Sequence, residues 1–335
     1  VPYDDFPTSV EVWDPSGKRL KQLALIPAKE NLPQGFDSVV TGPRNFAWRA
    51  DAPATLVYVV AQDGGDMKKD TAIHDRVFTL SAPFNAEPQA LLDLSMRFGD
   101  ITWGNDAIAL VSEWRYGDRQ TRTSKFSPSS PMEARVVFDE RSYNDAYRNP
   151  GAPVMTLSKF QTSVMNISAD GSILLTGIGA SAQGNIPFLD RHSFNSGKKE
   201  RLWHSKAPHY ERVATVLDSE AKQLLTLREA PQEQPNFYLR DLANGSSKAI
   251  SDFPHPTPAF ATIEKELIHY KRKDGVELTG TLYLPPGYTK EQGTLPVLMW
   301  AYPQEFKDAA IAGQVKDSPY QFNRVSYWGP LAHLA

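Results

Sequence analysis

Short runs of apolar and β-branched residues, separated by turn residues, make up most of the chain. Such runs are typical of strands that lie half-buried or fully buried in a sheet. Helical periodicity is almost absent before about residue 260. The pattern therefore predicts a mainly β fold. The strands that we expect are Val10–Trp13, Leu20–Leu25, Leu56–Val60, Val77–Leu80, Gln89–Leu94, Ile108–Val111, Val136–Phe138, Ile173–Thr176, Leu224–Leu227 and Phe237–Leu239.

A longer repeat appears when these strands are aligned. An apolar anchor is followed three positions later by an acidic turn residue, and then by a buried strand, at Trp48–Asp51, Trp103–Asp106, Ile167–Asp170 and Leu217–Glu220. The anchors lie about 50 to 64 residues apart, inside or slightly beyond the period of four-stranded propeller blades. We therefore expect a β-propeller over residues 1–258, with a two-sheet sandwich as the alternative. Because only four repeats and an opening pair of strands are present, we expect this propeller to be incomplete.

The pattern changes after Phe253–Ala259, a segment with three prolines in five residues. A stiff, extended linker is expected there, since proline is excluded from central strands. Beyond it, Glu266–Lys271 and Glu277–Leu284 flank an Asp-Gly turn and predict a hairpin. Leu295–Tyr302 is a continuous apolar run of the kind that forms a strand buried on both faces. We therefore expect residues 259–335 to begin an α/β domain.

The composition excludes several kinds of catalytic and binding site and leaves the predicted fold unchanged. The 335 residues include no cysteine, which excludes a thiol nucleophile, a thiolate metal site and disulfide bonds. A net charge of −3, from 36 basic and 39 acidic residues, argues against a general nucleic-acid binder. No apolar run reaches the roughly 18–20 residues of a membrane span. We therefore expect neither nucleic acid nor a membrane as a partner.

The residues that commonly hold metals or cofactors lack the required spacing. The seven histidines form no H-x-x-H or H-E-x-x-H pattern, so no local sequence pattern indicates a zinc site. Asp63–Asp66 has the composition of a calcium loop but not its ligand count, and we expect a tight turn between strands. The glycines never form a phosphate-binding loop. No metal and no cofactor are expected.

Several segments carry a further signal through their order along the chain. They are Trp48–Asp51, Ala61–Asp66, Gly184–Asp190, Tyr270–Tyr288, Leu295–Pro303 and Ala312–Pro319. Together they resemble the glutamyl endopeptidase branch of the prolyl oligopeptidase family. The stretches Tyr270–Tyr288 and Leu295–Pro303 are similar to the entry to the hydrolase domain of that family, and the likeness covers nearly the whole chain.

This resemblance implies a serine peptidase in which an N-terminal propeller precedes an α/β-hydrolase domain. The expected fold is thus mainly β, a partial β-propeller followed by the first strands of an α/β-hydrolase domain. The resemblance also implies cleavage after glutamate through a serine acyl-enzyme. The expected partners are a peptide substrate and the remainder of the hydrolase domain. The compartment stays open, with a periplasmic or secreted location favoured if the source is bacterial.

The resemblance places candidate site residues in the last part of the chain. Tyr302 stands where the family has a tyrosine whose hydroxyl helps to form the oxyanion hole. Lys307, Gln314 and Lys316 follow in a loop that resembles a substrate-side segment. A cation near the substrate glutamate is required, because a buried carboxylate must be paired. Alternative carboxylate partners from the propeller are Arg44, Arg49, Arg115, Arg119 and Arg122.

The chain departs from the family in one respect, because it contains no G-x-S-x-G elbow. We therefore expect the nucleophile, acid and histidine beyond Ala335, and we expect the chain alone not to hydrolyse peptides. Two other functions stay open. One is a non-catalytic propeller that binds a protein partner, and the other is a propeller glycosidase with two converging carboxylates.

Overall fold

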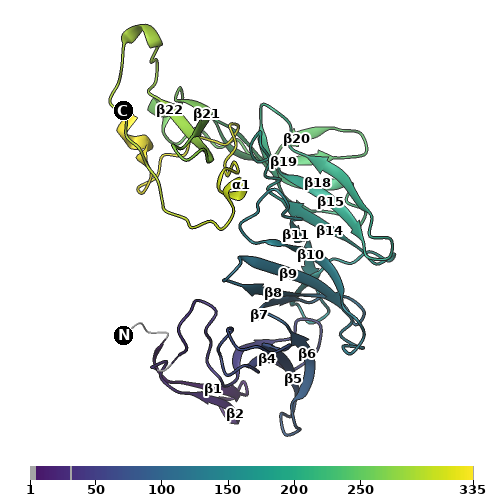
Figure 1. Cartoon of the computed structure of the whole chain (residues 1–335). Helices are drawn as coiled ribbons and strands as arrows, with labels where there is room; N and C mark the ends of the chain where they lie inside the picture. Colours follow the sequence, from purple (N-terminus) through teal and green to yellow (C-terminus); the bar gives the residue numbers. More distant parts are fainter. Residues whose placement is uncertain (1–4, 31, 335) are drawn as a thin grey trace. The chain divides into compact units, whose positions relative to one another are not determined.

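Nearly all of the regular structure is β in a computed structural model that describes residues 5–30 and 32–334 (Figure 1). The mainly β prediction is therefore confirmed. The chain divides into two compact units, Val1–Tyr143 with Met155–Asn166, and Asn144–Val154 with Ile167–Ala335. Within residues 5–30 and 32–334, no helix is both long and apolar enough to cross a membrane.

The first unit contains a hairpin, two four-stranded antiparallel sheets and a second short hairpin. In both four-stranded sheets the strands lie side by side in chain order. This order follows from tight turns that join each strand to its neighbour. The strands are β1 (Thr8–Trp13), β2 (Arg19–Ile26), β3 (Arg44–Trp48), β4 (Thr55–Ala61), β5 (Asp75–Ser81), β6 (Gln89–Leu94), β7 (Arg97–Thr102), β8 (Ala109–Arg115), β9 (Gln120–Phe126), β10 (Val136–Ser142), β12 (Met155–Leu157) and β13 (Ser163–Met165).

Strand β4 is buried on both of its faces. On one face Val59 lies in a core cluster with Val111 of β8. On the other face Tyr58 lies in a second cluster with Val12 of β1. The sheet β3–β6 is therefore packed between the hairpin β1–β2 and the sheet β7–β10. The continuous apolar sequence of β4 reflects this position, because both faces of the strand contact other sheets.

The second unit repeats the arrangement with two further four-stranded antiparallel sheets. Leu174, Leu189 and Leu224 join these two sheets in one core cluster. A separate hairpin follows, with its turn at Gly275 (φ +87°), as the sequence predicted. The elements are β11 (Ala152–Pro153), β14 (Ser172–Gly177), β15 (Phe188–Ser193), β16 (Lys199–His204), β17 (Tyr210–Val216), β18 (Gln223–Ala230), β19 (Glu233–Asp241), β20 (Ser247–Ala249), β21 (Glu264–Lys271), β22 (Glu277–Leu284) and the short helix α1 (Ala309–Ala312), with single 3₁₀ turns at Pro258–Phe260, Lys290–Gln292 and Pro330–Leu334.

Each copy of the sequence repeat forms the turn between the first and second strands of a four-stranded sheet. Every anchor-and-acid segment lies directly before the second strand, which is β4, β8, β14 or β18. In three of these turns a side-chain oxygen accepts a backbone N–H group, as with Asp170 Oδ1 and Ser172 N at 2.9 Å. In two repeats the residue that does this, Asn105 or Asp218, precedes the predicted acid by one or two positions. The described residues form four four-stranded sheets and three two-stranded hairpins, so the two-sheet sandwich is wrong.

A buried ion cluster holds the two sheets of the first unit together. The side chain of Arg97 on β7 is 1% exposed. Its Nη2 donates to Asp63 Oδ2 at 2.7 Å, and its Nη1 donates to Asp75 Oδ1 at 2.9 Å. His74 Nδ1 lies 2.7 Å from Asp63 Oδ2. These contacts satisfy buried charges that would otherwise be strongly destabilising.

Replacing Arg97 by methionine tests this cluster. Arg97→Met leaves two buried carboxylates without their main partner, so we expect the free energy of unfolding to fall by about 3–5 kcal/mol. The matched control is Arg76→Met on β5, which breaks the partly exposed pair with Asp93 on the neighbouring strand β6. A change within about 1 kcal/mol is expected there. Urea titration measures the free energy of unfolding of both variants. Equal decreases for the two would contradict the stabilising role of the buried Arg97 cluster.

Candidate functional site

Tyr302 lies in an extended, exposed segment. The run Leu295–Tyr302 forms no strand among the described residues, so the prediction of a strand is wrong for them. Val297 and Met299 are each 85% exposed, and Tyr302 is 91% exposed. An apolar strand is stabilised by neighbouring strands and by layers on both faces, and the described residues place neither against this run.

Gln314 is held by hydrogen bonds at both ends of its amide. Its Oε1 accepts the backbone N–H of Ala146 at 2.8 Å, and its Nε2 donates to Asp145 Oδ1 at 2.7 Å. The next residue, Val315, donates its backbone N–H to Tyr147 Oη at 2.9 Å. The loop after α1 is therefore anchored to the segment that precedes β11. Gln314 orients this loop rather than presenting a free amide.

Two of the segments that carried the family resemblance contact each other. Asn185 donates its backbone N–H to Asp317 O at 2.9 Å. Gly184 has φ +106°, and a Cβ there would lie 2.8 Å from Pro319 Cδ. A side chain at position 184 would therefore meet both backbone strain and a clash. This packing explains why a glycine occupies that position.

The two candidate lysines differ in their surroundings. Lys316 Nζ donates to Gln304 Oε1 and lies 4.3 Å from the centre of the Phe306 ring. Partial burial lowers the pKa of Lys316. Lys307 is exposed. The structure thus brings Gln304, Lys316 and Gln314 into one loop region, with Lys307 directly before α1.

A polar cavity that the sequence did not indicate lies beside this loop, with a volume of about 320 Å³. Lys265 Nζ lies 3.3 Å from Asp317 Oδ2, and the Lys265 side chain is 3% exposed. Glu229 Oε2 accepts the backbone N–H of Phe322 at 3.2 Å. The groups come from β18, β21, β22 and the last loop, so no local spacing could have identified them. The polar residues that line the cavity are Glu229, Lys265, Tyr283, Asp317, Gln321 and Arg324.

Burial perturbs the ionisable groups of this cavity. It raises the pKa of Glu229 and lowers the pKa of Lys265, because both charged forms lose hydration. Burial also raises the pKa of the Tyr283 hydroxyl to about 12. The cavity thus combines a buried cation with an acid that is more easily protonated than usual, a combination that can hold a small polar or acidic group.

The alternative propeller arginines all have protein partners. Arg49 and Arg115 form ion pairs with Asp51 and Asp118. Arg122 pairs with Glu113 and Glu140. Arg119 lies over the ring of Tyr116 and donates to its carbonyl oxygen, and Arg44 pairs with Asp75.

Asp63–Asp66 forms the tight turn that the sequence predicted. Asp63 Oδ1 accepts the backbone N–H of Gly65 at 2.8 Å, and its Oδ2 belongs to the Arg97 cluster. Its oxygens therefore stabilise the fold. Across residues 5–30 and 32–334, no group of three or more His, Asp or Glu side chains is arranged to hold a metal ion.

Comparison with known proteins identifies relatives over the whole chain. No protein-family profile matches it. The probable chloroplastic glutamyl endopeptidases of Oryza sativa subsp. japonica and Arabidopsis thaliana are each 40% identical to the chain and cover 100% of it. The chain spans 37% of the length of each relative.

Solved peptidase structures also match part of the chain. The acylaminoacyl peptidase of Pyrococcus horikoshii is 15% identical with a TM-score of 0.40, over 87% of this chain and 37% of its own. Oligopeptidase B of Leishmania major is 6% identical with a TM-score of 0.40, over 72% of this chain and 38% of its own.

The pH dependence of stability tests the cavity. A carboxyl whose pKa is raised in the folded state contributes stability at low pH, and this contribution is lost as pH rises through the folded pKa. Glu229→Gln keeps an acceptor for Phe322 but cannot ionise. We therefore expect the unfolding midpoint of the variant, relative to the unmodified chain, to rise between about pH 4 and about pH 8.

Exposed Glu266 on β21 provides the control for this experiment. Glu266→Gln changes a side chain that is exposed to solvent, so we expect its unfolding midpoint to stay close to that of the unmodified chain. A difference for Glu229→Gln that stays constant or falls with pH would contradict the burial of that carboxyl.

Proposed function

We propose that the chain belongs to the glutamyl endopeptidase family and that it forms the propeller and the entry to the hydrolase domain of a serine peptidase. The single observation that carries the proposal is the 40% identity over the whole chain to two proteins named as probable glutamyl endopeptidases. The four-stranded sheets support it, because their chain-order topology is that of propeller blades.

We propose a domain boundary near residue 258. The sheets before it are blades, and the hairpin β21–β22 after it starts the hydrolase domain. The proline-rich segment between them fits a linker, since Asn236 at β19 holds it by accepting the backbone N–H of Phe253 at 2.7 Å. A propeller in this position limits substrates to those that reach the site past its blades.

The exposed run Leu295–Tyr302 is proposed to become a central strand of the hydrolase sheet. Its side chains are apolar and of the β-favouring type, and their present exposure is unfavourable. Strands from the remainder of the hydrolase domain would cover both faces. This remainder is therefore the proposed partner of the chain.

In the proposed reaction Tyr302 serves as an oxyanion donor. A serine Oγ adds to the peptide carbonyl carbon, and its proton passes to a histidine. The Tyr302 hydroxyl donates a hydrogen bond to the carbonyl oxygen as this oxygen becomes negative. The C–N bond then breaks with protonation of the amine, and water hydrolyses the acyl-enzyme. The serine and histidine are proposed to lie outside these 335 residues, because the chain has no G-x-S-x-G elbow.

Cleavage after glutamate requires a cation for the substrate carboxylate. Of the three candidates, Gln314 already uses both ends of its amide within the protein. We propose that it positions the loop, and that Lys307 or Lys316 pairs with the substrate. Lys316 can exchange the neutral Gln304 oxygen for a carboxylate, which forms a stronger charge-assisted hydrogen bond.

Removing the Tyr302 hydroxyl tests the catalytic role. In the complete peptidase, Tyr302→Phe is expected to lower kcat by about 10²–10³-fold with little change in KM, since the donor acts mainly in the transition state. Tyr327→Phe is the control, because Tyr327 is equally exposed at 90%. A Tyr302→Phe enzyme with full activity would refute the role.

The choice of cation is tested by comparing substrates with Glu and Gln at the cleavage site. We expect Lys307→Met or Lys316→Met to lower the Glu-to-Gln ratio of kcat/KM by about tenfold or more. Lys290→Met serves as a control outside the loop. If neither loop variant changes the ratio, the cation lies elsewhere and both lysine assignments fail.

A further inference from the structure

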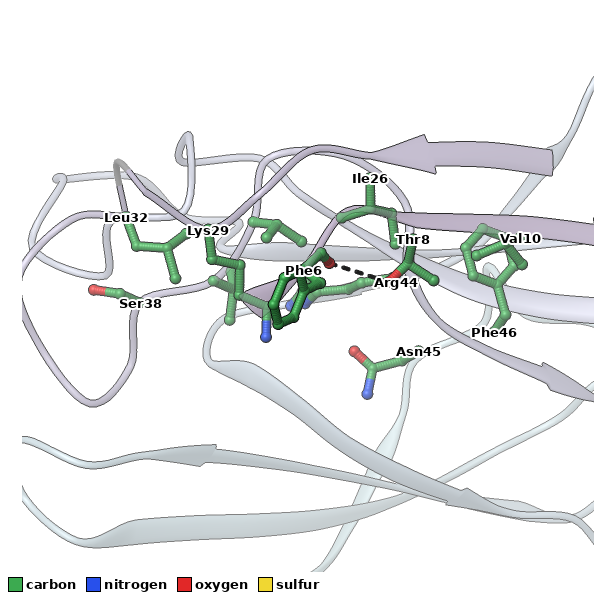
Figure 2. Close-up of a pocket in the computed structure, with 12 residues that line it drawn as sticks. Phe6, Thr8, Val10, Ile26, Lys29, Leu32, Ser38, Arg44, Asn45 and Phe46 are labelled. Carbon is green, nitrogen blue, oxygen red and sulfur yellow. Dashed lines mark hydrogen bonds between the residues drawn. The ribbon is translucent and has the colours of Figure 1, made fainter. Parts of the chain in front are cut away.

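A cavity of about 510 Å³ lies in the first unit between the hairpin β1–β2, the segment that follows it and strand β3 (Figure 2). Its walls are mostly apolar and include Val10, Ile26, Leu32 and Phe46. A volume of this size falls within the range of about 300–1,000 Å³ that is usual for small-molecule sites. The proposed peptidase reaction does not use this cavity, although Arg44, one of the alternative carboxylate partners named from the sequence, lies in its wall.

Two cations line the cavity, and no acidic residue is among its described lining residues. They are Lys29 and Arg44. Lys29 has only a distant partner, Asp5 Oδ1 at 3.9 Å. The cavity therefore has an apolar body with two cationic groups in its wall, which suits an anionic group on an apolar ligand.

Arg44 has an unused donor in a fixed position. Its Nη2 donates to Asp75, whose carboxylate is held in turn by Arg97. Its Nη1 is buried and has no hydrogen-bond partner among the described residues. An unsatisfied buried donor is unfavourable, and an acceptor from a ligand removes that penalty.

A break in strand pairing orients this part of β3. Arg44 pairs with Val59 and Ala47 pairs with Val57, so two residues of β3 face one residue of β4. Asn45, within this bulge, has φ +53°. Bulges of this kind redirect side chains and are frequent beside functional sites. Here the bulge turns Asn45 and Phe46 to the cavity.

We propose that this cavity binds a monocarboxylate on an apolar body, with the carboxylate on Arg44 Nη1 and Lys29 and the apolar part against Val10, Ile26, Leu32 and Phe46. The hydrogen bond to Arg44 is charge-assisted, and Lys29 adds a second cation. The C-terminus of a short apolar peptide and a fatty acid share this chemistry. The inference goes beyond the proposed peptidase function, and it stands without it.

Calorimetric titration of the full chain tests the proposal with two pairs of probes. One pair is octanoate and octanamide, and the other is N-acetyl-trileucine with a free or an amidated C-terminus. We expect at least one acid to bind about tenfold or more tightly than its amide. Preference for octanoate points to a fatty acid, and preference for the tripeptide acid points to a peptide terminus. No binding by either acid, or equal binding of acid and amide in both pairs, overturns the proposal.

Variants locate the carboxylate within the cavity. Arg44→Gln is expected to weaken binding of the acid by about tenfold or more, and Lys29→Met by about 2–5-fold. Lys29→Met leaves the buried Arg97 cluster intact, so it stays informative if Arg44→Gln impairs folding. Lys21→Met, on β2 and outside the described cavity lining, is the matched control. Equal losses for Lys29→Met and Lys21→Met would contradict the site.

Discussion

The described fold depends on strands that must be covered on both faces. Strand β4 has almost no polar side chain to present to water, so a sheet containing it needs a layer on each side. The hairpin β1–β2 supplies one layer, and the sheet β7–β10 supplies the other. The largely buried strands β8 and β14 impose a similar requirement. Within each unit, packing of one four-stranded sheet against the next satisfies it.

Buried charged side chains have different surroundings in the two units. In the first unit the buried Arg97 pairs with two carboxylates, and Arg44 supplies a second cation to the cluster from a cavity wall. In the second unit Lys265 and Glu229 lie in a polar cavity. Burial there destabilises the charged form of each side chain, which lowers the pKa of Lys265 and raises that of Glu229. The first arrangement is rigid and mainly structural. The second has groups whose protonation states can respond to a bound acid.

The strands with apolar runs could be predicted from sequence, because turn residues and β-branched side chains act locally. The sequence does not indicate β9 and β16, because their sequences, such as Gln120–Phe126, contain many polar residues and no apolar run. The anchored loop at Gln314 could be located only through family resemblance. The partners of that residue and of Lys265 come from segments far away in sequence, and single-sequence patterns carry no information on such contacts. The run Leu295–Tyr302 was predicted as a strand from its composition alone, whereas strand formation depends on neighbours.

The central claim is that this chain supplies the propeller and an oxyanion donor to a serine nucleophile located elsewhere in the polypeptide. Labelling the complete peptidase with a fluorophosphonate, followed by peptide mapping by mass spectrometry, tests this most directly. The account predicts one labelled serine outside the 335 residues, with protection by a glutamyl peptide. A labelled serine within these residues, or an unlabelled enzyme that still cleaves glutamyl peptides, would contradict it.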